Sequence, residues 1–158
     1  IYTAIVPSLF AYLLYRTKQI TTLTVTNRKE RPKVLLLTSG FFIALAYFLY
    51  LRGNVFSPTA IIIFSMAVNI WGLFIISFFD KISAHISALA GALGIFFGLY
   101  YWLNEQKALW AILVLLLLMG ITASARLYLG AHNLRQVIIG ALWGFVVGFG
   151  AIYFFMFI

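Results

Sequence analysis

Long apolar runs separated by short polar connections dominate the pattern along the chain. Six runs carry almost no charge, and they cover residues 1–15, 34–51, 59–79, 85–103, 108–124 and 136–158. A helix needs about 20 apolar residues to cross the hydrocarbon of a membrane. No run shows the period-two alternation of a membrane β-barrel strand. The pattern therefore predicts an all-α fold, a polytopic transmembrane helical bundle with about six spanning helices.

The amino-acid composition supports a membrane protein and indicates which binding partners to expect. Hydrophobic residues make up 65% of the chain and charged residues only 9%, whereas a soluble domain is about 25% charged. The absence of cysteine excludes disulfides and thiolate metal sites. The net charge of +8 favours contact with anionic lipid headgroups and, second, an anionic substrate. No nucleic-acid partner is expected, because the basic residues form no groove-reading helix.

We expect one domain over residues 1–158. The chain begins at Ile1 rather than Met, and we expect its natural N-terminus to be longer. Two glycine patterns predict close packing between helices, because small residues at every fourth position let backbones approach. They are Gly94 with Gly98, and Gly140 with Gly144 and Gly148.

Counting membrane crossings groups the polar connections. If all six runs span, the connections 16–33, 80–84 and 125–135 lie on one face, here called face A, and 52–58 and 104–107 lie on the other. Face A then holds both histidines, His85 and His132, and nine of the eleven basic residues: Arg16, Lys18, Arg28, Lys29, Arg31, Lys33, Lys81, Arg126 and Arg135. The positive-inside rule would put face A in the cytoplasm.

The two histidines at face A suggest phosphoryl transfer. His85 stands at a predicted helix start, where backbone N–H groups and the helix dipole favour an anion. Ser83 could cap that helix or donate its hydroxyl to a phosphoryl oxygen. His132 precedes Gln136 by four residues, and this partner could hold one imidazole nitrogen while the other attacks. Arg126 offers a planar fork for phosphate.

Arg28 and Arg31 offer a second pair of guanidinium donors. With few carboxylates nearby, the cluster suits a phosphohistidine mechanism in which one histidine attacks and the other protonates the leaving oxygen. A metal site built from His85, His132, Asp80 and Glu30 is disfavoured, because the arginines would repel a divalent cation.

Three short motifs resemble those of the type 2 phosphatidic acid phosphatase (PAP2) superfamily. Arg126, His132 and Gln136 have the spacing of its third motif, which reads Ser-Arg, five residues, His, three residues, Asp. The stretch 82–85 resembles the second motif, Pro-Ser-Gly-His, and Arg31-Pro32 resembles the end of the first, Lys, six residues, Arg-Pro. The resemblance covers roughly residues 24–150 and is closest to a short, divergent bacterial branch.

The resemblance implies a role for each residue. His132 would be the nucleophile, His85 the acid, and Arg126, Arg28 or Arg31 and the Ser83 hydroxyl would hold the phosphoryl oxygens. Arg28 or Lys29 would replace the first motif's Lys, where Thr24 stands. It also implies a bacterial inner-membrane protein with no metal or other cofactor, whose site more often faces the outer side of the membrane.

The leading hypothesis is a metal-independent phosphatase of a lipid phosphate or diphosphate, such as polyprenyl diphosphate or a phosphatidate-like lipid. The alternative is a catalytically weak or inactive PAP2-like protein that binds lipid phosphates or serves as a membrane-complex subunit. Gln136 is the reason for this alternative, because its side-chain carbonyl accepts a hydrogen bond from an N–H group but brings no negative charge. A transporter is disfavoured, since no run has a carboxylate in its interior. Asn69, a mid-span polar residue, is expected to hydrogen-bond a neighbouring helix.

Overall fold

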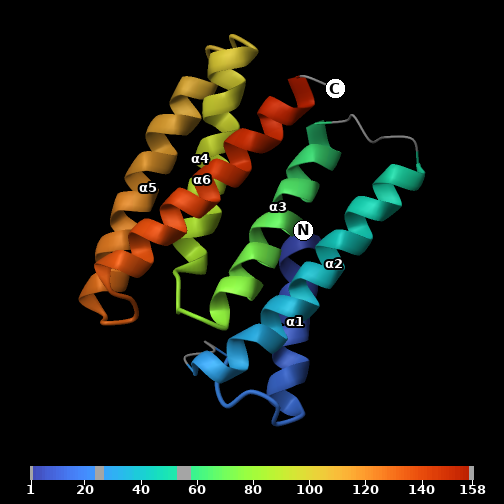
Figure 1. Ribbon diagram of the computed structural model, residues 1–158, viewed down its shortest axis with the longest axis vertical. Coiled ribbons are helices and arrows are strands. Elements are labelled where there is room, and N and C mark those ends of the chain that lie inside the picture. The colour runs from blue at the N-terminus through green and yellow to red at the C-terminus, as the bar shows by residue number, and fades with distance from the viewer. Residues whose placement is uncertain (1, 24–26, 53–57, 157–158) are drawn as a thin grey trace.

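The computed structural model describes residues 2–23, 27–52 and 58–156. Within these ranges the elements are all helical, and no strand occurs. They are α1 (Tyr2–Arg16), a short 3₁₀ helix η1 (Arg28–Glu30), α2 (Arg31–Leu51), α3 (Pro58–Ser77), α4 (Ala84–Trp102), α5 (Ala108–Tyr128) and α6 (Leu134–Met156) (Figure 1). The predicted all-α class is confirmed.

Five helices, α2 to α6, are long and apolar enough to cross a membrane. The first predicted span is instead a shorter apolar helix, α1. The expected six spans are therefore five long helices and one short one, and the chain is a multi-pass membrane protein.

Three helix ends differ from the predicted runs in a way that matters for the site. The helix α5 continues to Tyr128, so Arg126 lies in its last turn rather than in a connection. The helix α6 begins at Leu134, which puts Gln136 in its first turn. The helix α2 begins at Arg31 and has Pro32 at its start, where a missing N–H group costs no hydrogen bond. Charged and polar candidates are thus attached to rigid helix ends.

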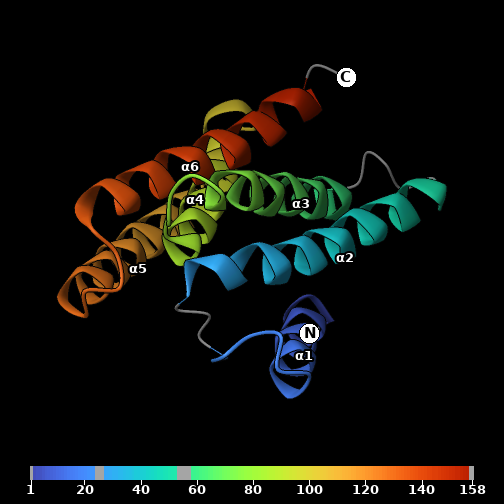
Figure 2. The ribbon, with the colours of Figure 1, turned by 60° about the horizontal axis from the view of Figure 1, so that its bottom comes forward.

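The helix α4 lies at the centre of the bundle. It packs against α6, α5 and α3, while α2 packs on α3 and α1 on α2. Figure 1 shows α4 behind α6, and Figure 2 shows α1 on the outer side of α2. Ile86, Ser87 and Ala90 on α4 are buried almost completely, as expected for a helix with neighbours on several sides.

The glycines of α6 let its backbone touch that of α4. A Cβ atom at Gly144 would collide with the carbonyl oxygen of Ser87, and one at Gly148 with the carbonyl oxygen of Gly91. On the α4 side, a Cβ at Gly94 would collide with the carbonyl oxygen of Phe145. The predicted glycine packing face is confirmed, and it fixes how the first turns of α4 and α6 lie relative to each other.

A buried polar network joins α3, α4 and α6 within the apolar bundle. The hydroxyl of Ser87 donates to Asn69 Oδ1 at 2.7 Å, and Asn69 Nδ2 donates to the Ser87 carbonyl oxygen at 3.3 Å. Trp143 Nε1 donates to the carbonyl oxygen of Asn69 at 3.2 Å. The predicted hydrogen bond from Asn69 to a neighbouring helix is confirmed.

The described connections fall at two ends of the bundle, as the crossing count predicted. The α1–α2, α3–α4 and α5–α6 connections lie at one end, and the α4–α5 turn lies at the other (Figure 1). The end that carries the first three is face A of the sequence analysis.

Candidate functional site

The turn between α5 and α6 places His132 beside the end of α5. Gly130 has a left-handed φ of 60°, a conformation that glycine adopts at little cost. Its N–H donates to the Leu127 carbonyl oxygen at 3.0 Å, and the Ala131 N–H donates to that of Arg126 at 3.1 Å. This is the Schellman pattern of hydrogen bonds that ends a helix. The five-residue spacer between Arg126 and His132 is therefore a tight helix stop.

The His132 ring contacts two oxygens through one nitrogen. Its Nδ1 lies 3.2 Å from Gln136 Oε1 and 3.2 Å from the carbonyl oxygen of Lys81. Both oxygens can only accept, so we assign the proton of the neutral ring to Nδ1, which leaves Nε2 with a free lone pair. The predicted pairing of His132 with Gln136 is confirmed, although His132 lies before the helix rather than within it.

Gln136 is held by the start of its own helix and by a neighbouring connection. Its backbone N–H donates to Asn133 Oδ1 at 2.9 Å, and its Oε1 accepts from the Asn133 N–H at 3.3 Å. This reciprocal pair is a capping box, with Asn133 before the helix and Gln136 in its first turn. The remaining amide group, Nε2, donates to Asp80 Oδ1 at 3.0 Å.

His85 lies near the other charged candidates. It is an exposed residue in the first turn of α4 and lies within electrostatic range of Arg126, His132 and Arg31. The Nη2 atom of Arg31 donates to the Ile82 carbonyl oxygen at 3.0 Å, which ties the start of α2 to the connection before α4. The structure thus gathers both histidines and two of the predicted arginines.

The environment of His132 favours its neutral form. Burial lowers the pKa of His132 below its ordinary value, and the positive charges of Arg31 and Lys81 act in the same direction. The hydrogen bonds to Gln136 and to the Lys81 carbonyl oxygen oppose this change without reversing it. A neutral ring with a free Nε2 is the form that a nucleophile requires.

Ser83 occupies the predicted N-cap position of α4 but makes no side-chain cap bond there. Its N–H donates to the Gln136 carbonyl oxygen at 3.4 Å. The side chain is fully buried, and within the described part of the chain its hydroxyl has no hydrogen-bond partner. A role for this hydroxyl in holding phosphate stays a prediction.

The remaining candidates come from the segment before α2. Lys29 is exposed, and its N–H donates to Asn27 Oδ1 at 3.1 Å. The side chain of Arg28 and all of Thr24 lie outside the described residues. The predicted replacement of the first motif's Lys by Arg28 or Lys29 is therefore untested.

Two contacts at the site were not predicted from sequence. From the sequence, Asp80 was a candidate only for a disfavoured metal site, and the Lys81 carbonyl oxygen was not a candidate. In the described part of the chain no three His, Cys, Asp or Glu side chains gather in a way that could hold a metal ion.

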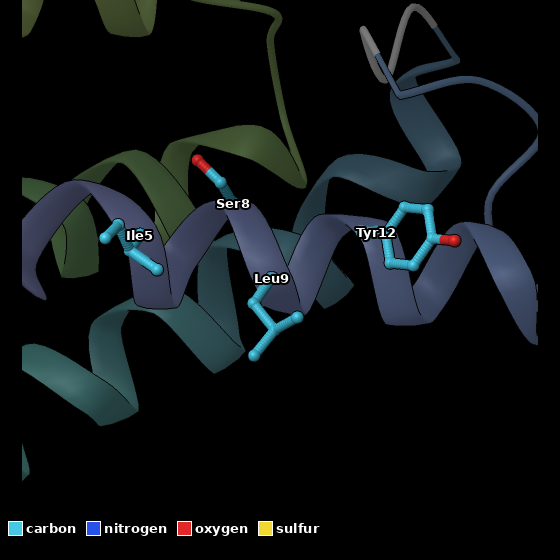
Figure 3. A pocket seen from close by; sticks show the side chains of 4 residues that line it. All are labelled: Ile5, Ser8, Leu9 and Tyr12. Atoms are coloured by element: carbon cyan, nitrogen blue, oxygen red, sulfur yellow. The ribbon is translucent and has the colours of Figure 1, made fainter.

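A surface hollow lies elsewhere and shares no residue with this cluster. Ile5, Ser8, Leu9 and Tyr12 line it, and all four belong to α1 (Figure 3). Its lining is mostly apolar and contains no histidine or charged side chain, so it does not supply groups for phosphoryl chemistry.

Comparison with known proteins identifies the family. The model of the PAP2 superfamily matches residues 74–157, which is more than half of the chain. The chain belongs to the PAP2 superfamily. The matched part begins in α3 and contains both histidines, Arg126 and Gln136, whereas Arg28 and Arg31 precede it. No curated protein and no solved structure matches the chain. Membership places this multi-pass protein in a family of helical membrane phosphatases.

Proposed function

We propose that the chain is an integral-membrane, metal-independent phosphatase that hydrolyses a lipid phosphate or diphosphate in the bacterial inner membrane. The observation that carries this proposal is the geometry of His132. Its Nδ1 faces two acceptors at 3.2 Å, so Nε2 is free, and His85, Arg31 and Arg126 are gathered around the same end of the bundle.

The proposed reaction has two steps, and these groups support it. Nε2 of His132 attacks phosphorus, the bond from phosphorus to the lipid oxygen breaks, and His85 gives its proton to that oxygen. Water then attacks the phosphohistidine, His85 takes the water's proton, and the nitrogen–phosphorus bond breaks to release phosphate. The guanidinium groups of Arg31 and Arg126 neutralise the phosphoryl oxygens during both steps. Arg28, Lys29 and Ser83 are further candidates for phosphate contacts.

The position of the site supports a lipid phosphate as the substrate class. The cluster sits at the ends of apolar helices that leave large hydrophobic side chains exposed, such as Leu117, Leu142 and Val146. A lipid can keep its chains in the membrane and bring its phosphate sideways to the helix ends. Polyprenyl diphosphate and phosphatidate-like lipids fit this arrangement.

The test is phosphate release by the purified protein in detergent with EDTA present. Phosphatidate, phosphatidylglycerol phosphate and polyprenyl diphosphate are compared as substrates. The variant His132→Ala is expected to reduce release by about 10³-fold or more, because it removes the nucleophile. Lys107→Ala, at the opposite end of the bundle, is the control and should keep its activity. Equal release by the wild type and His132→Ala would contradict the proposal.

A second candidate is a PAP2-like protein that binds lipid phosphates without turnover, alone or as a subunit of a membrane complex. Gln136 favours this second candidate, because its amide brings no charge to His132. The capping box with Asn133 also explains the presence of Gln136 without any catalytic role. This candidate predicts that vesicles containing phosphatidate bind the protein, while no phosphate release depends on His132.

A further inference from the structure

We infer that Asp80 is a positioning residue for His132 and that it acts through the side-chain amide of Gln136. The inference rests on the proposed function. Three side chains lie in series: Asp80 Oδ1 is 3.0 Å from Gln136 Nε2, and Gln136 Oε1 is 3.2 Å from His132 Nδ1. They come from the connection before α4, the first turn of α6 and the turn before it.

The donor and acceptor types allow only one orientation of the amide. A carboxylate only accepts hydrogen bonds, so the NH₂ group of Gln136 must face Asp80, and its carbonyl oxygen must then face His132. If the amide were flipped, its oxygen would face the Asp80 carboxylate and its NH₂ group would face the Nδ1–H of His132. The hydrogen bonds of Gln136 to Asp80 and to His132 would then both be lost. The Asn133 N–H, 3.3 Å from Gln136 Oε1, favours the same orientation.

Asp80 is itself held in place by its surroundings. Its Oδ1 accepts from the Lys81 N–H at 2.6 Å, and its Oδ2 lies 3.3 Å from Arg135 Nη2. Its side chain is only 28% exposed, whereas that of Arg135 is 75% exposed. The next residue, Lys81, provides the second acceptor for His132 Nδ1. The connection before α4 therefore supplies two groups that act on His132. The Lys81 carbonyl oxygen faces Nδ1 directly, and the Asp80 carboxylate acts through the amide of Gln136.

Two residues act here at the position where the third PAP2 motif has a single Asp. Gln136 provides the oxygen that accepts from the imidazole, and Asp80 provides the negative charge and fixes the amide. Since Asp80 and Gln136 are 56 positions apart, their pairing depends on how the α3–α4 and α5–α6 connections meet.

The test is a double-mutant cycle of Asp80→Ala and Gln136→Asp, measured as phosphate release with His132→Ala as the blank. In the natural background, Asp80→Ala should lower kcat by about tenfold or more with KM nearly unchanged, a loss of the size seen when the hydrogen-bond partner of a metal-ligating histidine is removed. In the Gln136→Asp background the new carboxylate accepts directly from His132. No amide then needs orienting, and the two acids repel each other. There, Asp80→Ala should leave kcat unchanged or raise it.

The outcomes separate this inference from the proposed function. An equal loss of kcat in both backgrounds, or no loss in either, would overturn the positioning role while leaving the phosphatase standing. Glu105→Ala is the matched control, because Glu105 also accepts a nearby backbone N–H, that of Lys107 at 3.3 Å, but lies at the opposite end. It should behave as the wild type.

If no release depends on His132, the proposed function fails and the inference is tested on the ring itself. Nitrogen-15 spectra of labelled histidine, assigned with His132→Ala, should show one neutral tautomer with the proton on Nδ1 in the natural chain. Asp80→Ala should give a mixture of tautomers. An unchanged spectrum in Asp80→Ala would overturn the inference.

Discussion

At the residue scale, the same positive charges that suit a phosphate also act on the histidine that would attack it. Burial lowers the pKa of His132, and Arg31 and Lys81 lower it further. The hydrogen bond from Nδ1 to Gln136 partly opposes them. Since attack requires the neutral ring, a lowered pKa keeps more of the protein competent at neutral and mildly acidic pH.

This gives a pH dependence with a definite sign. The neutral form of His132 predominates above its folded-state pKa, so the activity that depends on it is present there and is lost as the pH falls through that value. Because the pKa is lowered, the acidic limb of kcat/KM should lie below the ordinary histidine value of about 6.5. A pH–rate profile in EDTA checks this, and an acidic midpoint above that value would contradict it.

Residue identities predicted part of the site and missed the rest for a physical reason. The spacing of Arg126, His132 and Gln136 was enough to predict the imidazole–amide pair, because all three lie around one short turn. The Asp80 contact was not predictable, since it depends on the approach of two connections that are distant in sequence. The same holds for Arg31, which donates to the Ile82 carbonyl oxygen instead of presenting every N–H to a ligand.

At the element scale, the apolar runs predicted the five long helices but not their ends. An apolar run ends where the first polar or charged residues appear, whereas a helix continues until a capping motif or a residue with left-handed φ ends it. Gly130 gives that signal for α5, and the Asn133–Gln136 capping box gives it for the start of α6. Arg126 and Gln136 consequently belong to helices, and their backbone positions are fixed.

The contact between α4 and α6 can be tested with two glycines of the same helix. Gly144→Ala places a Cβ atom against the Ser87 carbonyl oxygen, whereas Gly150→Ala meets nothing within 4 Å. Overpacking should make Gly144→Ala less stable by about 1–3 kcal/mol. Gly150→Ala measures the gain from helix propensity alone, about 1 kcal/mol at most. In mixed detergent, the free energy of unfolding should fall in Gly144→Ala and stay the same or rise in Gly150→Ala. Equal stability of the two variants would contradict the close packing.

At the scale of the whole molecule, the placement of both histidines at one end follows from an even number of long helices between the three connections. That count was predictable from hydropathy alone. The shortness of α1 does not alter it, because α1 precedes all three connections. Which side of the membrane this end faces is a separate matter, because the basic residues there are also the phosphate candidates.

The arrangement across the membrane can be tested with single cysteines, since the natural chain has none. Leu129→Cys lies in the α5–α6 turn and Gln106→Cys in the α4–α5 turn, and both positions are exposed. An impermeant thiol reagent added to intact cells should label one and not the other. Labelling of both would contradict the fold. The excess of basic residues at face A predicts that Gln106→Cys is the labelled variant, and labelling of Leu129→Cys instead would place the site outward, as the family resemblance implies.

The backbone contact between α4 and α6 has a consequence for how bilayer thickness acts on the site. Helices adjust to a thicker or thinner bilayer by tilting. His85 is carried by α4 and His132 by the turn leading into α6, and no flexible side chain separates these two backbones at Gly144. We therefore expect the two histidines to tilt as one unit when the bilayer changes. Arg31 sits on α2, which packs on α3 and reaches the connection before α4 through the hydrogen bond from Arg31 to the Ile82 carbonyl oxygen. We therefore expect a change of bilayer thickness to act on that hydrogen bond before it acts on the pair of histidines.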